Sequence, residues 1–221
     1  SVPLGYNHPK MLNDENFKHN LLMAAIANPS NSDVYTQQYA QFVKTFGEIG
    51  IPSYLPHAFF IAGGGLAIEN ALKVAMDWKV QKNFKKGYTE EKGFKVLHFE
   101  NAFHGRTGYT MSLTNTHPDK TKWFAKFDWP RVSVPKVVFP LEGDNLAQVI
   151  SAEEYTCAQI KQAFLDNKDD ICAIIIEPIQ SEGGDNHIRE EFLAQLRAIA
   201  DENDAFLIYD EVQTGVGLTG K

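Results

Sequence analysis

Long apolar runs, paired cysteines and basic clusters are all scarce in this sequence, and each scarcity excludes a class of protein. No run of 18 apolar residues and no charged-then-apolar leader occurs, so we expect neither a membrane span nor secretion. Cys157 and Cys172 are the only cysteines and lack C-x-x-C spacing, which favours a reducing, cytoplasmic compartment without disulfides. The formal net charge of -7 argues against a nucleic-acid partner.

The residue patterns of common metal sites and hydrolases are also missing. None of the histidines forms an H-x-x-x-H pair or has a cysteine or carboxylate at metal-ligand spacing, so we expect no metal site. No serine lies in a G-x-S-x-G motif, which excludes the nucleophile turn of many hydrolases. The basic cluster Lys82, Lys85 and Lys86 is interpreted as the solvated end of a helix.

What the sequence does contain is an alternation of apolar strands and amphipathic helices. Four short runs are of strand type: residues 58–61, 95–99, 171–176 and 206–209, of which all but 95–99 are continuously apolar. Residues 21–27, 34–46, 68–80, 153–165 and 189–203 are interpreted as helical, most clearly where apolar residues recur at helical spacing. This alternation predicts an α/β fold with a parallel-dominated sheet and helices on both faces.

Polar residues follow these apolar runs at the positions where ligands of such sheets bind. The glycines at 63–65 separate an apolar run from a helix start, a position that suits either a phosphate on free N–H groups or a tight turn. Asp210 ends the last apolar run and is either a turn cap or a partner for a cationic group. Arg106 is either a surface residue or a clamp for a carboxylate.

The last residues of the chain also match most of a nucleotide-binding loop. Residues 215–221 spell G-x-x-x-x-G-K, and Asp210 with Glu211 could be taken for a magnesium-binding pair. In nucleotide hydrolases, however, the glycine loop comes first and the acidic strand later. Because the order here is reversed, we interpret the match as chance.

Four motifs together resemble the class III, or ω-amino acid, aminotransferases, which use pyridoxal 5'-phosphate on the fold-type I scaffold. They are G-G-G-L-A-I-E-N-A at 63–71, A-F-H-G-R at 102–106, E-P-I-Q-S-E-G-G at 177–184 and Y-D-E-V-Q-T-G at 209–215. Their order and spacing match over nearly the whole chain. The resemblance implies that residues 1–30 lead from a small domain and that residues 31–221 form part of the cofactor-binding large domain.

The resemblance also implies which residues hold the cofactor. Gly64 and Gly65 would present backbone N–H groups to its phosphate, and Gln213 would reach its phenolic oxygen. Phe103 would stack on one face of the pyridine ring, and Val212 would pack on the other.

Three charged residues receive catalytic or substrate-binding roles from the same resemblance. Asp210 would pair with the ring nitrogen and keep it protonated. Arg106 would bind the α-carboxylate of the substrate. Glu182 is similar to the carboxylate that masks a second arginine when the amine substrate binds and moves aside for 2-oxoglutarate.

Within the family, the nearest likeness is to enzymes that act on the ε-amino group of L-lysine in lysine catabolism. It is carried by residues 28–35, 112–116, 127–131 and 217–220. The expected reaction of the intact protein, a homodimer, is transfer of that amino group to 2-oxoglutarate, giving glutamate and 2-aminoadipate 6-semialdehyde. A 4-aminobutyrate or ornithine aminotransferase, or a non-catalytic relative serving as a binding or structural subunit, are the alternatives.

The Schiff-base lysine of the family belongs to a later strand, beyond residue 221. The second arginine and most of the small domain are expected there as well. We therefore expect the chain to be partial, and inactive by itself.

Overall fold

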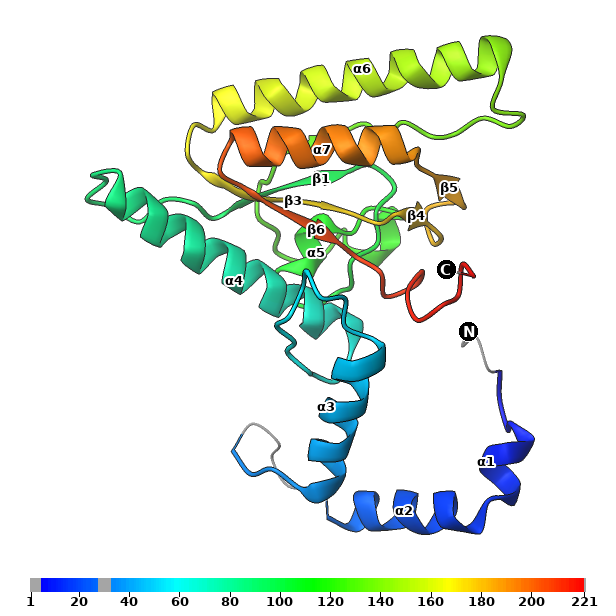
Figure 1. Ribbon diagram of the computed structural model, residues 1–221. Helices are drawn as coiled ribbons and strands as arrows, with labels where there is room; N and C mark the ends of the chain where they lie inside the picture. Colours follow the sequence, from blue (N-terminus) through cyan, green and yellow to red (C-terminus); the bar gives the residue numbers. More distant parts are fainter. Residues whose placement is uncertain (1–4, 28–32, 221) are drawn as a thin grey trace. The chain divides into compact units, whose positions relative to one another are not determined.

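The computed structural model describes residues 5–27 and 33–220, which form two compact units (Figure 1). The larger unit comprises residues Ile61–Thr214. The described residues before Ile61, together with Gly215 and the residues after it, form the other. The division expected at residue 30 between a small-domain segment and the large domain stays a prediction.

The smaller unit, as far as the structure describes it, contains three helices: α1 (Pro9–Asn13), α2 (Glu15–Ile26) and α3 (Gln37–Ile49). Side-chain caps start the last two: Asp14 accepts a hydrogen bond from the backbone N–H of Phe17 at 3.0 Å, and Thr36 accepts one from Tyr39 at 3.1 Å. Such caps satisfy N–H groups that have no partner inside the helix.

The larger unit, Ile61–Thr214, is built on a four-stranded parallel sheet. Its strands lie in the order β2 (Arg131–Val132), β1 (Lys95–Phe99), β3 (Ile171–Ile176) and β6 (Phe206–Tyr209). Three of these are the strands expected from the apolar runs, with the same bounds. The central strand β3 is buried along its whole length, as its unbroken apolar sequence predicts.

Helices cover both faces of this sheet (Figure 1). On one face, α6 (Gly143–Asp166) and α7 (Glu190–Glu202) pack on β3 side chains such as Ile174 and Ile176. On the other face, α4 (Gly64–Lys85) and α5 (Thr110–Leu113) pack on Cys172, Ala173 and Ile175. The expected α/β fold is confirmed, and the helix expected at 153–165 proves to be part of the longer α6.

Shorter elements complete the unit: η1 (Pro118–Lys120) and the antiparallel pair β4 (Ile179–Gln180) and β5 (Asn186–His187). In residues 5–27 and 33–220, no helix combines the length and the apolar character that crossing a membrane requires.

The strand expected at residues 58–61 does not form. These residues have no partner strand in the described chain, and Phe59 is largely exposed. A strand needs a neighbour for its backbone N–H and C=O groups, and an apolar run alone does not supply one. The glycines at 63–65 therefore join an irregular segment, not a strand, to the start of α4.

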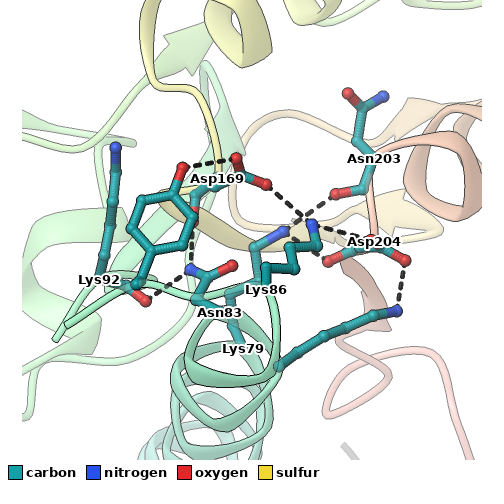
Figure 2. A network of polar contacts seen from close by, with 9 residues as sticks. Lys79, Asn83, Lys86, Lys92, Asp169, Asn203 and Asp204 are labelled. Carbon is teal, nitrogen blue, oxygen red and sulfur yellow. Dashed lines mark hydrogen bonds and ion pairs between the residues drawn. The ribbon is translucent and has the colours of Figure 1, made fainter. Parts of the chain in front are cut away.

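A buried lysine joins α4 to the turn between α7 and β6 (Figure 2). Lys79 is 1% exposed, and its Nζ donates to the carbonyl oxygens of Asn203 at 3.0 Å and Asp204 at 2.8 Å. Burial, and then the positive charge of Lys86, lowers the pKa of Lys79. The lysine therefore fills a core position and satisfies two carbonyl groups at the amino-terminal edge of the sheet.

The basic cluster expected as a solvated helix end also forms ion pairs with distant residues, which Figure 2 shows for Lys86. Lys82 forms an ion pair with Asp204, and Lys86 pairs with Asp169 at 2.9 Å and with Asp204 at 3.1 Å. Lys85 and Lys86 are exposed, as expected, and Lys82 is half-buried. The acidic partners lie more than 80 residues away, at separations of 83 and 122, so the helix sequence carries no sign of them.

Replacing Lys79 with methionine tests this contact. Methionine keeps most of the apolar stem but leaves two carbonyl groups without their donor, so the free energy of unfolding should fall by about 1–3 kcal/mol. Urea unfolding measures the change. Lys73→Met, at an exposed position of the same helix, is the control and should change it by less than about 0.5 kcal/mol. Equal stability of both variants would contradict the role of Lys79.

Candidate functional site

The candidate site residues lie together where the three longer strands of the sheet end. The loop that begins after β1 carries Phe103, His104 and Arg106, while Glu177 follows β3 and Asp210 follows β6. Because these strands are parallel and adjacent, their carboxyl ends lie at one edge of the sheet. All of these residues belong to the unit Ile61–Thr214.

Asp210 is buried, and both of its carboxylate oxygens contact nitrogen atoms of the protein. It is 5% exposed, and its Oδ2 lies 2.7 Å from Nδ1 of His104. Its Oδ1 accepts a hydrogen bond from the backbone N–H of Val212 at 3.1 Å, and its own N–H donates to Ile176 of β3 at 2.9 Å. One oxygen thus caps the following turn while the other faces a buried ring, and lone pairs remain for a further cationic group.

His104 is as buried as the carboxylate that it contacts. Its backbone N–H donates to the hydroxyl of Thr114 at 3.0 Å, and that hydroxyl donates to the carbonyl of Gly105 at 2.6 Å. Because an ionised carboxylate only accepts, Nδ1 of His104 carries the hydrogen in the contact with Asp210. In the part of the chain that the structure describes, Nε2 is buried without a hydrogen-bond partner.

Glu177 places a second carboxyl group beside this pair. Its Oε1 accepts a hydrogen bond from the backbone N–H of Phe103 at 2.8 Å, and its side chain is almost fully buried. Burial is the main cause that raises the pKa of Glu177 to about 7, with Asp210 and Glu182 adding to it and the Phe103 N–H and His104 opposing it. Near neutral pH, Glu177 is therefore only partly ionised.

The start of α4 brings backbone close to this edge. Gly63 has φ +102°, and a Cβ on Gly64 would lie 2.8 Å from both methyl groups of Val212. A Cβ on Gly105 would lie 2.9 Å from the Cα of Gly65. These approaches require glycine, and the first N–H groups of a helix have no partner inside it. The result is a half-buried helix start that suits a phosphate.

The loop with Glu182 is fastened to the loop that follows β1. Gln180 donates to the carbonyl of Glu100 at 2.8 Å. A Cβ on Gly183 would lie 2.1 Å from the carbonyl oxygen of Asn101, so only glycine fits there. Glu182 itself is about half exposed at this point.

Lys120, which the sequence motifs do not include, forms an ion pair with Glu182. Its Nζ also donates to the hydroxyl of Thr116 at 2.9 Å and lies 5.3 Å from the ring centroid of Phe103. Lys120 and Glu182 are separated by 62 positions in the sequence, so no local sequence signal predicts this contact.

The remaining expected site residues lie farther toward solvent. Arg106 is exposed and pairs with no carboxylate among residues 5–27 and 33–220. Val212 is exposed beside Gly64, and Gln213 is half-buried. Within the same residues, no group of three or more His, Cys, Asp or Glu side chains could hold a metal ion.

This donor set fits pyridoxal 5'-phosphate. The helix start at Gly64 and Gly65 suits its phosphate, and the held carboxylate of Asp210 suits a protonated ring nitrogen. The half-buried ring of Phe103 is an apolar surface at the same edge of the sheet.

Comparison with known proteins gives the same family. The family described as "Aminotransferase class-III" matches residues 1–221. The L-lysine-epsilon aminotransferase of Mycobacterium tuberculosis is 49% identical over 220 residues, and that of Streptomyces clavuligerus is 46% identical. The human mitochondrial 4-aminobutyrate aminotransferase is 30% identical over 249 residues. Each alignment covers 100% of this chain.

The fold also matches that of a solved structure. The lysine aminotransferase from M. tuberculosis, in its internal aldimine form, has a TM-score of 0.93 and 48% identity over 98% of this chain. The match covers 49% of that structure, and the chain spans about half the length of the curated relatives it matches, 48% of the M. tuberculosis enzyme. On the family match over all of its residues, this chain belongs to the class III aminotransferases.

Proposed function

We propose that the complete protein transfers the ε-amino group of L-lysine to 2-oxoglutarate, giving glutamate and 2-aminoadipate 6-semialdehyde in lysine catabolism. The observation that carries this proposal is the 46–49% identity to L-lysine-epsilon aminotransferases along the whole chain. Identity to 4-aminobutyrate aminotransferases is lower, at 30–33%. The proposed cofactor is pyridoxal 5'-phosphate, on which the family depends.

The backbone at the start of α4 would hold the cofactor's phosphate. Gly64 and Gly65 would donate their N–H groups, and the positive end of the helix dipole favours an anion there. Phe103 and Val212 would enclose the ring, and Gln213 would donate to its phenolic oxygen. When bound, the cofactor supplies a protonated ring that withdraws electrons from the carbon that loses a proton.

Asp210 would supply the negative charge that keeps the ring nitrogen protonated. Its contacts with His104 and with the N–H of Val212 fix both oxygens in place. A carboxylate positioned in advance costs no reorganisation during the reaction. Glu177, with its pKa near 7, would add only part of a second negative charge, so Asp210 would stay the main partner of the nitrogen.

Arg106 and Glu182 would divide the recognition of substrates between them. The exposed guanidinium of Arg106 is available for the α-carboxylate of lysine, which would leave the distal amine at the cofactor. Glu182 would act as the carboxylate whose position differs between the amine and the keto-acid substrates.

We also propose that the complete protein is a cytoplasmic homodimer. The exposed apolar side chains on α2, such as Leu21, Leu22 and Ile26, support burial against another subunit. The two unpaired, buried thiols Cys157 and Cys172 support a reducing compartment.

The amine substrate can be tested with half-reactions of the complete, cofactor-loaded protein. L-lysine, L-ornithine and 4-aminobutyrate are each added without keto acid, and the cofactor's absorbance is followed together with product identification. Lysine is expected to react with the highest kcat/KM and to yield the cyclised semialdehyde. Faster reaction with 4-aminobutyrate or ornithine would replace the proposal by the alternative enzyme, and no reaction with any amine would favour a non-catalytic relative.

Asp210→Asn should slow the proton-transfer step far more than it weakens substrate binding. Asparagine can still cap the turn at Val212 but carries no charge, so the single-turnover rate with lysine should fall on the order of 10²-fold or more. Saturation of that rate with lysine gives the binding constant separately. Glu211→Gln, which changes an exposed neighbour, is the matched control. Equal losses in rate and binding would contradict the role of Asp210.

Glu177→Gln should change how the stability of the cofactor-free protein depends on pH. The pKa of Glu177 is raised from 4.5 to about 7, so between these values the folded state binds more protons than the unfolded state. The wild type therefore loses stability as pH rises through this window, by about 3 kcal/mol at most.

The glutamine variant should lack this loss, so its stability relative to the wild type should increase from pH 4.5 to 7. Urea unfolding across that range measures the difference. Glu100→Gln, at an exposed position directly after β1, is the control and should keep the wild-type profile. Parallel profiles for wild type and Glu177→Gln would show that this carboxyl is not perturbed.

A further inference from the structure

We propose that Lys120 is a specificity-determining residue, which neutralises Glu182 and thereby lets the site accept a dicarboxylate keto acid. The inference rests on the proposed function, because it assigns Glu182 to the recognition of substrates. It concerns a residue outside all the motifs that indicate the family.

The ammonium group of Lys120 lies among three partners that hold it at the site. It pairs with Glu182, donates to Thr116 at 2.9 Å and faces the ring of Phe103 at 5.3 Å. Contact of a cation with an aromatic face adds to the attraction of the ion pair. Lys120 therefore lies between the carboxylate proposed to select substrates and the ring proposed to hold the cofactor.

Its backbone is fixed by the short helix η1. His117 accepts a hydrogen bond from Asp119 at 3.2 Å, and the N–H groups of Thr121 and Lys122 donate to the carbonyl of Pro118 at 3.1 Å and 2.9 Å. These bonds orient the residue that ends the helix. The side chain of Lys120 is 28% exposed, so most of its surface contacts protein and the rest contacts solvent.

The balance of charge explains why such a cation matters. Asp210, Glu182 and the partly ionised Glu177 place three acidic groups at this edge of the sheet, which also carries the exposed cation Arg106. An acidic edge attracts a cationic amine and repels a dicarboxylate. Both substrates of the proposed reaction must use one site, and Glu182 would move aside from the expected second arginine when 2-oxoglutarate binds. A cation that pairs with the displaced Glu182 then reduces its repulsion of the dicarboxylate. In the described residues, Lys120 is the one cation that forms an ion pair with Glu182.

The chain offers a matched control two residues away. Lys122 pairs with Asp119 and lies over the ring of Trp123 at 5.3 Å, so it resembles Lys120 in its type of contact but not in its partners. Lys122→Met removes the same charge from the same segment and leaves Glu182 paired.

The test measures binding of glutarate, an unreactive dicarboxylate, to the complete, cofactor-loaded protein by calorimetry. Lys120→Met should weaken glutarate binding by about threefold to tenfold, with no comparable change for the monocarboxylate butyrate. Lys120→Arg should restore binding, and Lys122→Met should bind like the wild type. In steady-state assays, Lys120→Met should raise the KM for 2-oxoglutarate and not that for lysine, with kcat little changed.

A second arm tests whether Lys120 acts through Glu182. In a Glu182→Gln background no charge remains to be neutralised, so the effect of Lys120→Met on glutarate should shrink toward none. An undiminished effect there would overturn the proposal, as would wild-type glutarate binding by Lys120→Met or equal losses for glutarate and butyrate. A wild type that transaminates no amine would overturn the proposed function instead, and the binding measurements would still decide the role of Lys120.

Discussion

A carboxylate that is taken out of water needs donors around it, and the contacts of Asp210 organise much of the site. The ring of His104 and the N–H of Val212 supply those donors, and the N–H of Asp210 itself is bonded to β3. These bonds link the loop that follows β1 to the adjacent ends of β3 and β6. Because Val212 then lies against Gly64, the turn that Asp210 caps also meets the start of α4.

The central strand of the sheet is the part that the sequence predicts most directly, since a strand that is buried on both faces is continuously apolar. This holds for β3, which has no polar residue between Ile171 and Ile176. The same signal is wrong at residues 58–61, where apolar residues have no partner strand. Lys79 shows the opposite failure, a polar residue in the core that the sequence pattern does not predict. Its burial depends on carbonyl groups 124 and 125 residues away.

Only the site residues that belong to recognisable sequence motifs could be predicted from the sequence. The glycines of α4 and the acidic end of β6 are visible in the sequence, because loops after parallel strands carry the ligands of such sheets. The contacts among them are not: His104 lies 106 residues from Asp210, and Lys120 lies 62 residues from Glu182. The raised pKa of Glu177 likewise follows from burial, which only the folded chain creates.

The central claim is that Asp210 is a partner for a cationic ring nitrogen. The most direct test is ¹⁵N NMR of the complete protein loaded with pyridoxal 5'-phosphate labelled at the ring nitrogen. In the wild type, the ¹⁵N chemical shift should be that of a protonated pyridine and should stay so as pH rises through neutrality. In Asp210→Asn, it should move to the value of a neutral pyridine. The same protonated shift in both proteins would contradict the account.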